Sequence, residues 1–224
     1  MTNFQRARSE EQREIRRQTV LDTTADMLEE MPVGELSLNE LSRRVGLAKS
    51  NVLRYFDSRE AILLELLDHA WQQWTTDLPG LLNAGIDADA PLSRRGEQLA
   101  TAIAASLAER RILCDLLSSQ ASVLEHNVSP EVAARSKRAA VANVIAIAEP
   151  VRQHLPELGD SAPQLVAAMI MTIGAVWTHA RPSPAMLAAY NADPSLTAYK
   201  LDFPTALQDM LATLTAGTLT RMTA

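Results

Sequence analysis

The segment that most constrains the fold is residues 36–60, which read LSLNELSRRVGLAKSNVLRYFDSRE. Ser37 and Glu40 have the spacing of a capping box, which starts a helix by satisfying its free backbone N–H groups. Gly46 then ends this helix, because glycine tolerates the positive φ angle that a sharp turn requires. A second short helix is predicted directly after the turn, around residues 49–55. The pattern predicts a helix-turn-helix, with an ordinary helical hairpin as the alternative.

The apolar positions of this segment suit two short helices that pack across each other. Leu41 and Val45 are the inward positions of the first helix, and the small Ser42 lets the second helix approach closely. Val52 and Tyr55 continue the apolar face after the turn. With these positions turned inward, the second helix presents four polar side chains outward: Lys49, Ser50, Asn51 and Arg54.

Helical periodicity continues over the rest of the chain. Ser9 has capping-box spacing and predicts a first helix to about residue 30, with apolar positions every three or four residues from Val20 to Met31. Asp57-Ser58-Arg59-Glu60 is a third capping signature, and the helix after it is predicted to end near Pro79-Gly80. Further helices are expected at about residues 92–109, 111–126, 130–154, 161–180 and 204–221, with one short helix around residues 185–190.

Composition supports an all-α fold. The chain has 224 residues, enough for one large domain or two modest ones. Aromatic residues make up only 4%, while Ala and Leu, which favour helices, are abundant. The net charge is −6, but arginines gather near the N-terminus: Arg6, Arg8, Arg13, Arg16 and Arg17. This asymmetry favours a front that binds nucleic acid, with scattered solvated charge as the alternative.

Catalytic and metal-binding patterns are absent from the sequence. The histidines lie far apart, without metal-ligand spacing to one another or to Cys114, and no G-x-S-x-G, Walker A or G-x-G-x-x-G pattern occurs. We therefore expect no enzyme, cofactor or metal, and Cys114 as a small core residue rather than a redox sensor. The longest apolar run, residues 165–177, is too short to span a bilayer, and the N-terminus lacks a signal-peptide core. We therefore expect a cytoplasmic protein without a membrane partner.

Residues 10–68 resemble the DNA-binding part of the tetracycline-repressor-like (TetR) family. Four segments carry the resemblance: Leu36-Ser37-Leu38 at the start of the helix-turn-helix, Val45-Gly46-Leu47 at its turn, Arg54-Tyr55-Phe56 at its aromatic end, and Asp57 to Ile62 at the entry to a fourth helix. Three positions depart from the family pattern: Ala48 for a capping serine, Leu53 for the first aromatic residue, and Arg59 for a lysine. These departures affect single contacts with DNA and not the class.

The resemblance implies an all-α fold with two domains. An N-terminal three-helix helix-turn-helix domain, residues 1–57, would bind DNA, and a helical domain, residues 58–224, would bind an effector and form a dimer. The implied function is that of a ligand-responsive transcriptional regulator, a repressor that a small-molecule effector releases from a palindromic operator of double-stranded DNA. Two other classes stay open as alternatives: an enzyme on a borrowed helical fold, and a nucleoid or scaffold protein that binds DNA without a ligand.

The resemblance also assigns roles to individual residues of the first domain. Phosphate contacts are implied for Ser37, Lys49, Tyr55 and Arg59. Lys49 has a base edge as its alternative, and Tyr55 a place in the core. Base contacts are implied for Ser50, Asn51 and Arg54, since asparagine suits adenine and arginine suits guanine. Either a DNA contact or a solvated helix face is open for Arg43 and Arg44, and Arg6 and Arg8 would touch the minor groove or phosphates.

In the second domain, the resemblance implies a ligand pocket and a dimer interface. The candidate pocket residues, each with a plain core position as its alternative, are Trp71, Trp74, Leu113, Cys114, Leu117, Gln120, Met169, Thr172, Ile173, Trp177 and His179. The homodimer would be built by the helices at about residues 161–180 and 204–221, because their small and apolar faces allow close packing. Those faces carry Ala167, Ala168, Gly174 and Ala175 on one helix, and Leu207, Leu211, Leu214 and Leu219 on the other.

Overall fold

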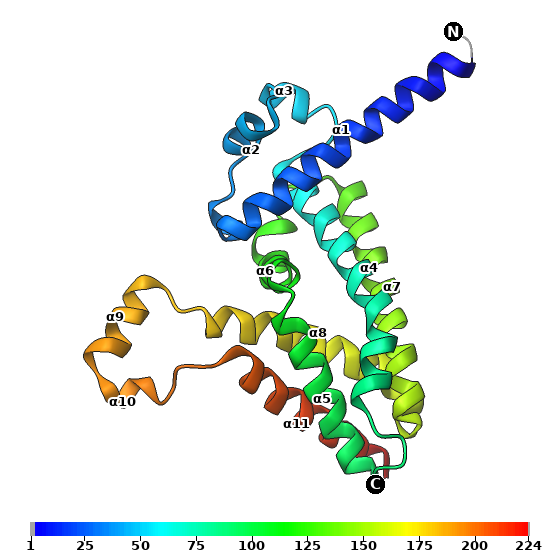
Figure 1. Ribbon diagram of the computed structural model, residues 1–224, viewed down its shortest axis with the longest axis vertical. Helices are drawn as coiled ribbons and strands as arrows, with labels where there is room; N and C mark the ends of the chain where they lie inside the picture. The colour runs from blue at the N-terminus through cyan, green and yellow to red at the C-terminus, as the bar shows by residue number, and fades with distance from the viewer. Residues whose placement is uncertain (1–2, 224) are drawn as a thin grey trace. The chain divides into compact units, whose positions relative to one another are not determined.

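The computed structural model describes the backbone of residues 3–223 and the side chains of residues 10–222. Over this part of the chain the backbone forms helices and loops without a β-strand (Figure 1), which confirms the predicted all-α fold. The chain divides into two compact units. The head unit contains the residues up to His69 together with Ser119–Lys137, and the body unit contains Ala70–Ser118 and the residues from Arg138 on.

The head unit begins with the helices that the sequence predicted for the helix-turn-helix. It contains α1 (Asn3–Glu30), a 3-10 turn η1 (Val33–Glu35), α2 (Leu38–Val45), α3 (Lys49–Val52), the first part of α4 (Arg59–Gly85), a π-helical turn η2 (Gln120–Leu124) and the start of α7 (Pro130–His154). α1 packs against α2, and α2 packs against α3. Five of the apolar positions predicted for the first helix are buried: Val20, Leu21, Thr24, Met27 and Leu28.

The structure corrects the predicted start of the first helix. The capping box at Ser9 placed that start near residue 9, but α1 begins at Asn3 and continues through this position. Residues 3–8 contain neither glycine nor proline, so their backbone does not oppose a helix. A capping box marks a boundary only where the capping residue itself is non-helical, and spacing alone does not establish that.

The body unit holds the remaining helices. It contains the second part of α4, α5 (Leu92–Ala108), nearly all of α6 (Arg111–Ser119), most of α7, a 3-10 turn η3 (Pro156–Ser161), α8 (Ala162–Ala180), α9 (Pro184–Ala192), α10 (Pro194–Thr197) and α11 (Phe203–Thr223). α11 packs against α5 and α8, and η3 packs against α8 and α11. Gly96 lets α5 approach α11 closely, since a Cβ at this position would lie 3.3 Å from the methyl group of Thr215.

α4 passes the proline at which the sequence predicted its end. Pro79 lies inside the helix, which continues to Gly85. An interior proline costs about 3 kcal/mol, because it removes one backbone hydrogen bond and crowds the preceding turn. Leu78 and Leu82 on either side of it are fully buried, and each such side chain contributes about 1.5–3 kcal/mol. Burial in the body core therefore offsets the local preference for a break.

The faces of α8 and α11 also differ from the sequence expectation. Leu207 and Leu211, expected on a dimer face, are fully buried, and α11 packs against α5 and α8 of the same chain. Gly174, expected to face a partner, faces α6, where a Cβ would lie 3.5 Å from Cα of Ser118. Sequence periodicity identifies an apolar face but does not say whether its own chain or a second copy covers it. Leu207 and Leu211 are therefore covered by their own chain, whereas Ala175, expected on the same dimer face, is exposed.

One helical stretch, Pro156–Ala180, is long and apolar enough to cross a membrane by length and composition alone. The stretch is not one regular helix, because Gly159 has φ 47° and ψ −128° and separates η3 from α8. Leu165, Val166 and Ile173 of α8 are buried in the body unit.

Candidate DNA-binding site

The turn between α2 and α3 forms as the sequence predicted. The hydroxyl of Ser37 accepts a hydrogen bond from the backbone N–H of Glu40 at 3.2 Å and caps the start of α2. Gly46 ends the helix in the left-handed conformation, with φ 72° and ψ 27°. The next N–H, that of Leu47, donates to the carbonyl of Ser42 at 3.0 Å and completes the turn. A side chain at position 46 would be strained here, which explains the glycine.

α3 has no side-chain cap and ends at Val52, so it is shorter than the helix predicted around residues 49–55. Ala48 stands before the helix in an extended conformation, and its carbonyl accepts from the N–H groups of Asn51 at 2.8 Å and Val52 at 3.2 Å. Val52 is fully buried and Phe56 nearly so. These two apolar residues determine which face of the segment turns inward. The opposite face is therefore held toward solvent by packing rather than by a cap.

The outward face of α3 and of the turn after it carries a group of polar side chains without partners. Four residues are exposed, as the sequence predicted: Lys49, Ser50, Asn51 and Arg54. Among the residues that the structure describes, none of these four side chains takes part in a hydrogen bond or an ion pair. Their donors and acceptors are available to a ligand, and no internal contact has to break first. This is the chemistry that reading of base edges or phosphates requires.

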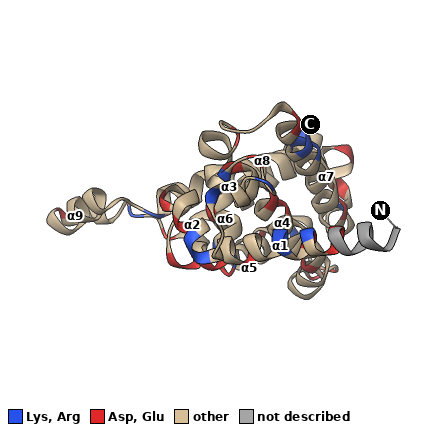
Figure 2. Cartoon of the chain, turned by 90° about the horizontal axis from the view of Figure 1, so that it is seen from above, with Lys and Arg blue, Asp and Glu red and all other residues tan. Residues whose placement is uncertain are grey.

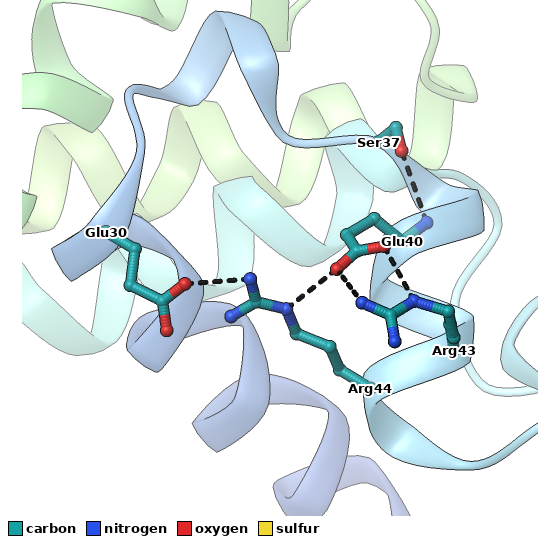
Figure 3. A network of polar contacts seen from close by, with 5 residues as sticks. All are labelled: Glu30, Ser37, Glu40, Arg43 and Arg44. Atoms are coloured by element: carbon teal, nitrogen blue, oxygen red, sulfur yellow. Dashed lines mark hydrogen bonds and ion pairs between the residues drawn. The ribbon is translucent and has the colours of Figure 1, made fainter.

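Figure 3 shows why Arg43 and Arg44 differ from the residues of α3. Glu40 accepts from Arg43 Nη2 at 2.6 Å and Nε at 2.9 Å, and from Arg44 Nε at 3.0 Å. Arg44 also pairs with Glu30 of α1 at 2.7 Å. The hydrogen bond from Arg43, and after it that from Arg44, lowers the pKa of Glu40 to about 2. Glu40 is therefore ionised at neutral pH, and Glu30 and Glu40 together offset the charge of the two arginines.

The distribution of charge over the structure agrees with this pairing. In Figure 2 the basic residues of α1, α2 and α3 lie among acidic ones. Among the described residues from Leu38 to Tyr55, Lys49 and Arg54 are the cations without a carboxylate partner. The side chains of Arg6 and Arg8 lie outside the described residues.

Arg59 and Ser37, two of the predicted phosphate contacts, are partly engaged inside the chain. Arg59 is largely buried, donates to the carbonyl of Leu36 at 2.8 Å and pairs with Glu60 at 2.9 Å. These contacts join the start of α4 to the residues before α2. The hydroxyl of Ser58 caps α4 by accepting from the N–H of Ala61 at 3.1 Å. Tyr55 is half-buried. The DNA contacts of Ser37, Tyr55 and Arg59 stay predictions.

Arg17 is the residue of the site that the sequence reasoning missed. Its guanidinium donates to the carbonyl of Tyr55 at 2.6 Å and to both carboxylate oxygens of Glu65 at 2.5 Å. It also lies 4.4 Å from the centre of the Phe56 ring. Arg17 therefore joins α1 to Tyr55, in the turn after α3, and to Glu65 of α4. The spacing from Arg17 to Val20 is three residues, which places it on the buried face of α1, and this signal could have found it.

The candidate pocket residues lie mainly in the body unit, and most are buried. Trp71 and Trp74 are neighbours, with ring centroids 5.4 Å apart, and the indole N–H of Trp74 donates to Ser106 Oγ at 3.0 Å. Buried Cys114 keeps its thiol, because burial, and after it the charge of Asp115, raises the pKa of this group to about 12. At neutral pH the thiol is therefore protonated and poorly reactive.

Three of the other candidates differ from this group. Gln120 belongs to the head unit and donates to Glu125 at 2.9 Å. His179 is exposed. The indole N–H of Trp177 donates to the buried carboxylate of Asp115 at 3.3 Å. Asp115 was not among the residues predicted for the pocket. Within the described residues, no group of three or more His, Cys, Asp or Glu side chains is placed to hold a metal ion.

These features define the class of protein: an all-helical chain whose head unit carries a helix-turn-helix with an exposed polar recognition helix. The family described as bacterial regulatory proteins, tetR family, matches residues 20–66. The family described as tetracyclin repressor-like, C-terminal domain, matches residues 68–222. The chain belongs to the TetR family of bacterial transcriptional regulators. Proteins of this family bind DNA and are regulators rather than enzymes.

Individual relatives and one solved structure are similar to parts of the chain. The chain is 33% identical over 70 residues to the HTH-type transcriptional regulator EthR of Mycobacterium tuberculosis, and equally to that of Mycobacterium bovis. The match covers 31% of this chain, and the chain spans 32% of the length of these curated relatives. A crystal structure of a protein assigned to the tetR family, from Shewanella sp. PV-4, aligns with 88% of this chain and 96% of its own, at 16% identity and a TM-score of 0.49.

Proposed function

We propose that this chain is a cytoplasmic, ligand-responsive repressor that binds a palindromic operator as a homodimer and leaves it when a small molecule binds. The observation that carries the DNA-binding part is the set of four exposed, unpartnered polar side chains on α3 and the turn that follows it. In this proposal residues 1–57 bind DNA, and residues 58–224 bind the effector and form the dimer.

The recognition helix supports two kinds of contact. Asn51 and Arg54 are proposed to read base edges in the major groove, where asparagine pairs with adenine and arginine with guanine. Ser50 is proposed to support this reading. Lys49 is proposed as a phosphate contact, which fixes position but reads no sequence. Ser37, Tyr55 and Arg59 are proposed as further phosphate contacts, and Arg43 as a weaker one because Glu40 offsets its charge.

We expect the loss of a base contact and the loss of a phosphate contact to have different effects on DNA binding. Asn51→Ala or Arg54→Ala should each weaken operator binding by about 1–3 kcal/mol per half-site and relax the preference at particular base pairs. Lys49→Ala should weaken operator and scrambled DNA alike, and reduce the salt slope by about one for each lost contact. The measurement is the dissociation constant for operator and scrambled duplexes over a salt series.

The matched control for this experiment is Arg94→Ala. Arg94 is an exposed arginine of the body unit that pairs with Glu97 three residues away. Its removal changes the net charge as Arg54→Ala does but should leave sequence preference unchanged. If Asn51→Ala and Arg54→Ala keep the full preference for operator over scrambled DNA, the base-reading assignment is wrong.

A small-molecule effector is proposed to act through the body unit. The support is the family to which the chain belongs and the apolar, tryptophan-containing region around Trp71, Trp74 and Trp177. An effector can shift the equilibrium only by its differential affinity, so a tenfold loss of operator affinity needs about tenfold tighter binding to the DNA-free form. We expect a compound library titrated against the operator complex to contain dissociating compounds that do not bind the duplex alone. A complex that no compound dissociates would contradict this proposal.

The operator is proposed to be an inverted repeat. A two-fold dimer presents two copies of α3, and such helices read half-sites about one helical turn of DNA apart, or a multiple of that spacing.

A further inference from the structure

The first turns of α1 extend beyond the core of the head unit. Residues 10–16, which we call the α1 extension, are all exposed, and the first buried residue among those described in the helix is Val20. The helix begins at Asn3, so the part before Arg17 is about 20 Å long at about 1.5 Å per residue. Figure 1 shows this part in dark blue, running clear of α2 and α3. The described side chains of the extension are therefore open to a partner.

Two arginines of the α1 extension are not engaged inside the chain. Arg13 and Arg16 are exposed, and neither forms an ion pair or a side-chain hydrogen bond with another described residue. They are three residues apart, so they share one side of the helix. The acidic residues of the extension follow one another round the adjoining side: Glu10, Glu11 and Glu14. One side of the extension is therefore basic, although its total charge is not.

The basic side of the extension is turned toward the helix-turn-helix. Residues seven or eleven apart in a helix lie almost directly in line, which places Arg13 in line with Val20 and Arg16 in line with Met27. Val20 and Met27 are both fully buried, and α1 packs against α2. The two arginines therefore continue the side of α1 that packs on the rest of the head unit.

Arg17 fixes where the extension begins relative to the recognition helix. Its guanidinium donates to the carbonyl of Tyr55, in the turn that directly follows α3, at 2.6 Å. Arg13 lies one helical turn before Arg17 on the same side of α1, a distance of about 5–6 Å along the helix axis. The unpartnered charge of Arg13 thus lies about one helical turn from the side chain that holds the end of the recognition segment.

We propose that Arg13 and Arg16 bind phosphates of double-stranded DNA outside the base pairs that α3 reads in each half-site. The inference rests on the DNA-binding function proposed above and adds a contact from α1. A guanidinium binds phosphate through two parallel hydrogen bonds, and no internal ion pair of Arg13 or Arg16 has to break first. Such contacts fix position and add affinity but read no sequence.

The first test measures the salt dependence of binding. The probe is the duplex that the full-length wild-type chain selects from a randomised pool, beside a scrambled duplex of the same length. We expect Arg13→Ala, Arg16→Ala to weaken binding to both duplexes by about tenfold or more. The salt slope should fall by about 3–4, at about 0.9 for each of two contacts in two half-sites. The bases preferred in a selection by the variant should be unchanged.

Two further variants control this test. Arg135→Ala, Lys137→Ala removes two exposed cations from α7 in the same head unit, without an ion pair to a described residue, and should leave the salt slope unchanged. Arg13→Lys, Arg16→Lys keeps the charges and should keep most of the slope, which separates loss of phosphate contacts from a folding defect. A slope that falls as far with the lysines as with the alanines overturns the phosphate contact.

The second test locates the contacts by ethylation interference, in which each phosphate is neutralised in turn. We expect phosphates whose ethylation weakens the wild-type chain but not Arg13→Ala, Arg16→Ala, and we expect them outside the positions that show a base preference. Identical interference maps, or differences confined to the base pairs with a preference, overturn the α1 contact alone. If the wild-type chain selects no duplex from the pool, the proposed DNA-binding function falls and this contact with it.

Discussion

Replacing Trp74 by alanine is expected to lower the free energy of unfolding by about 3–5 kcal/mol, the range for removal of a large buried aromatic side chain. Trp74 is 1% exposed, and its ring lies beside that of Trp71. Alanine would leave a cavity and remove the donor to the Ser106 hydroxyl. The measurement is urea unfolding followed by far-ultraviolet circular dichroism at one fixed protein concentration.

Two further variants give this prediction its control. Trp74→Phe keeps most of the ring and loses only the hydrogen bond, so it should cost about 1–2 kcal/mol. Ile145→Ala removes an exposed apolar residue and should change the unfolding free energy by less than about 0.5 kcal/mol. If Trp74→Ala costs no more than Ile145→Ala, Trp74 lines an open pocket rather than the core, and its place among the candidate effector residues gains support.

Arg17→Ala is expected to destabilise the head unit by about 2–4 kcal/mol, because it leaves the carboxylate of Glu65 and the carbonyl of Tyr55 without their donor. Both side chains of the ion pair are only 24% exposed, so water replaces the lost contact poorly. Operator affinity should fall as well, since Arg17 holds the carbonyl of Tyr55 in the turn that directly follows α3. Arg17→Lys keeps the charge but not the forked geometry and should recover only part of the loss.

The salt dependence of DNA binding separates this structural role from a direct contact. Because Arg17 is proposed to touch no phosphate, Arg17→Ala should leave the salt slope of operator binding unchanged at a temperature where the variant is folded. The neighbouring Arg16→Ala, an exposed arginine on the same helix, should leave stability unchanged. Unchanged stability of Arg17→Ala together with a lower salt slope would show that Arg17 binds a phosphate.

Much of the head unit could be predicted from the sequence because its signals are local. Ser37 caps α2, Gly46 takes the positive φ of the turn, and Val52 is buried, all as the spacing of residues 36–60 predicted. Capping and glycine conformation depend on a few neighbouring residues, so they can be read without tertiary structure. The same segment predicted the outward face of α3 and carried the resemblance to the family to which the chain belongs.

The tertiary structure alone decided which helix faces and charges are already engaged. Arg17 and Arg44 were two cations among several in the sequence, but contacts with Glu65, and with Glu30 and Glu40, engage them inside the head unit. Burial of Leu78 and Leu82 carries α4 past Pro79, and burial of Leu207 and Leu211 places in the core a face that suggested a dimer. The sequence by itself determined helices, caps and turns, because these depend on neighbours along the chain. Contacts between different helices, such as that of Arg17 with Glu65, depend on how the helices pack, and no local pattern contains that information.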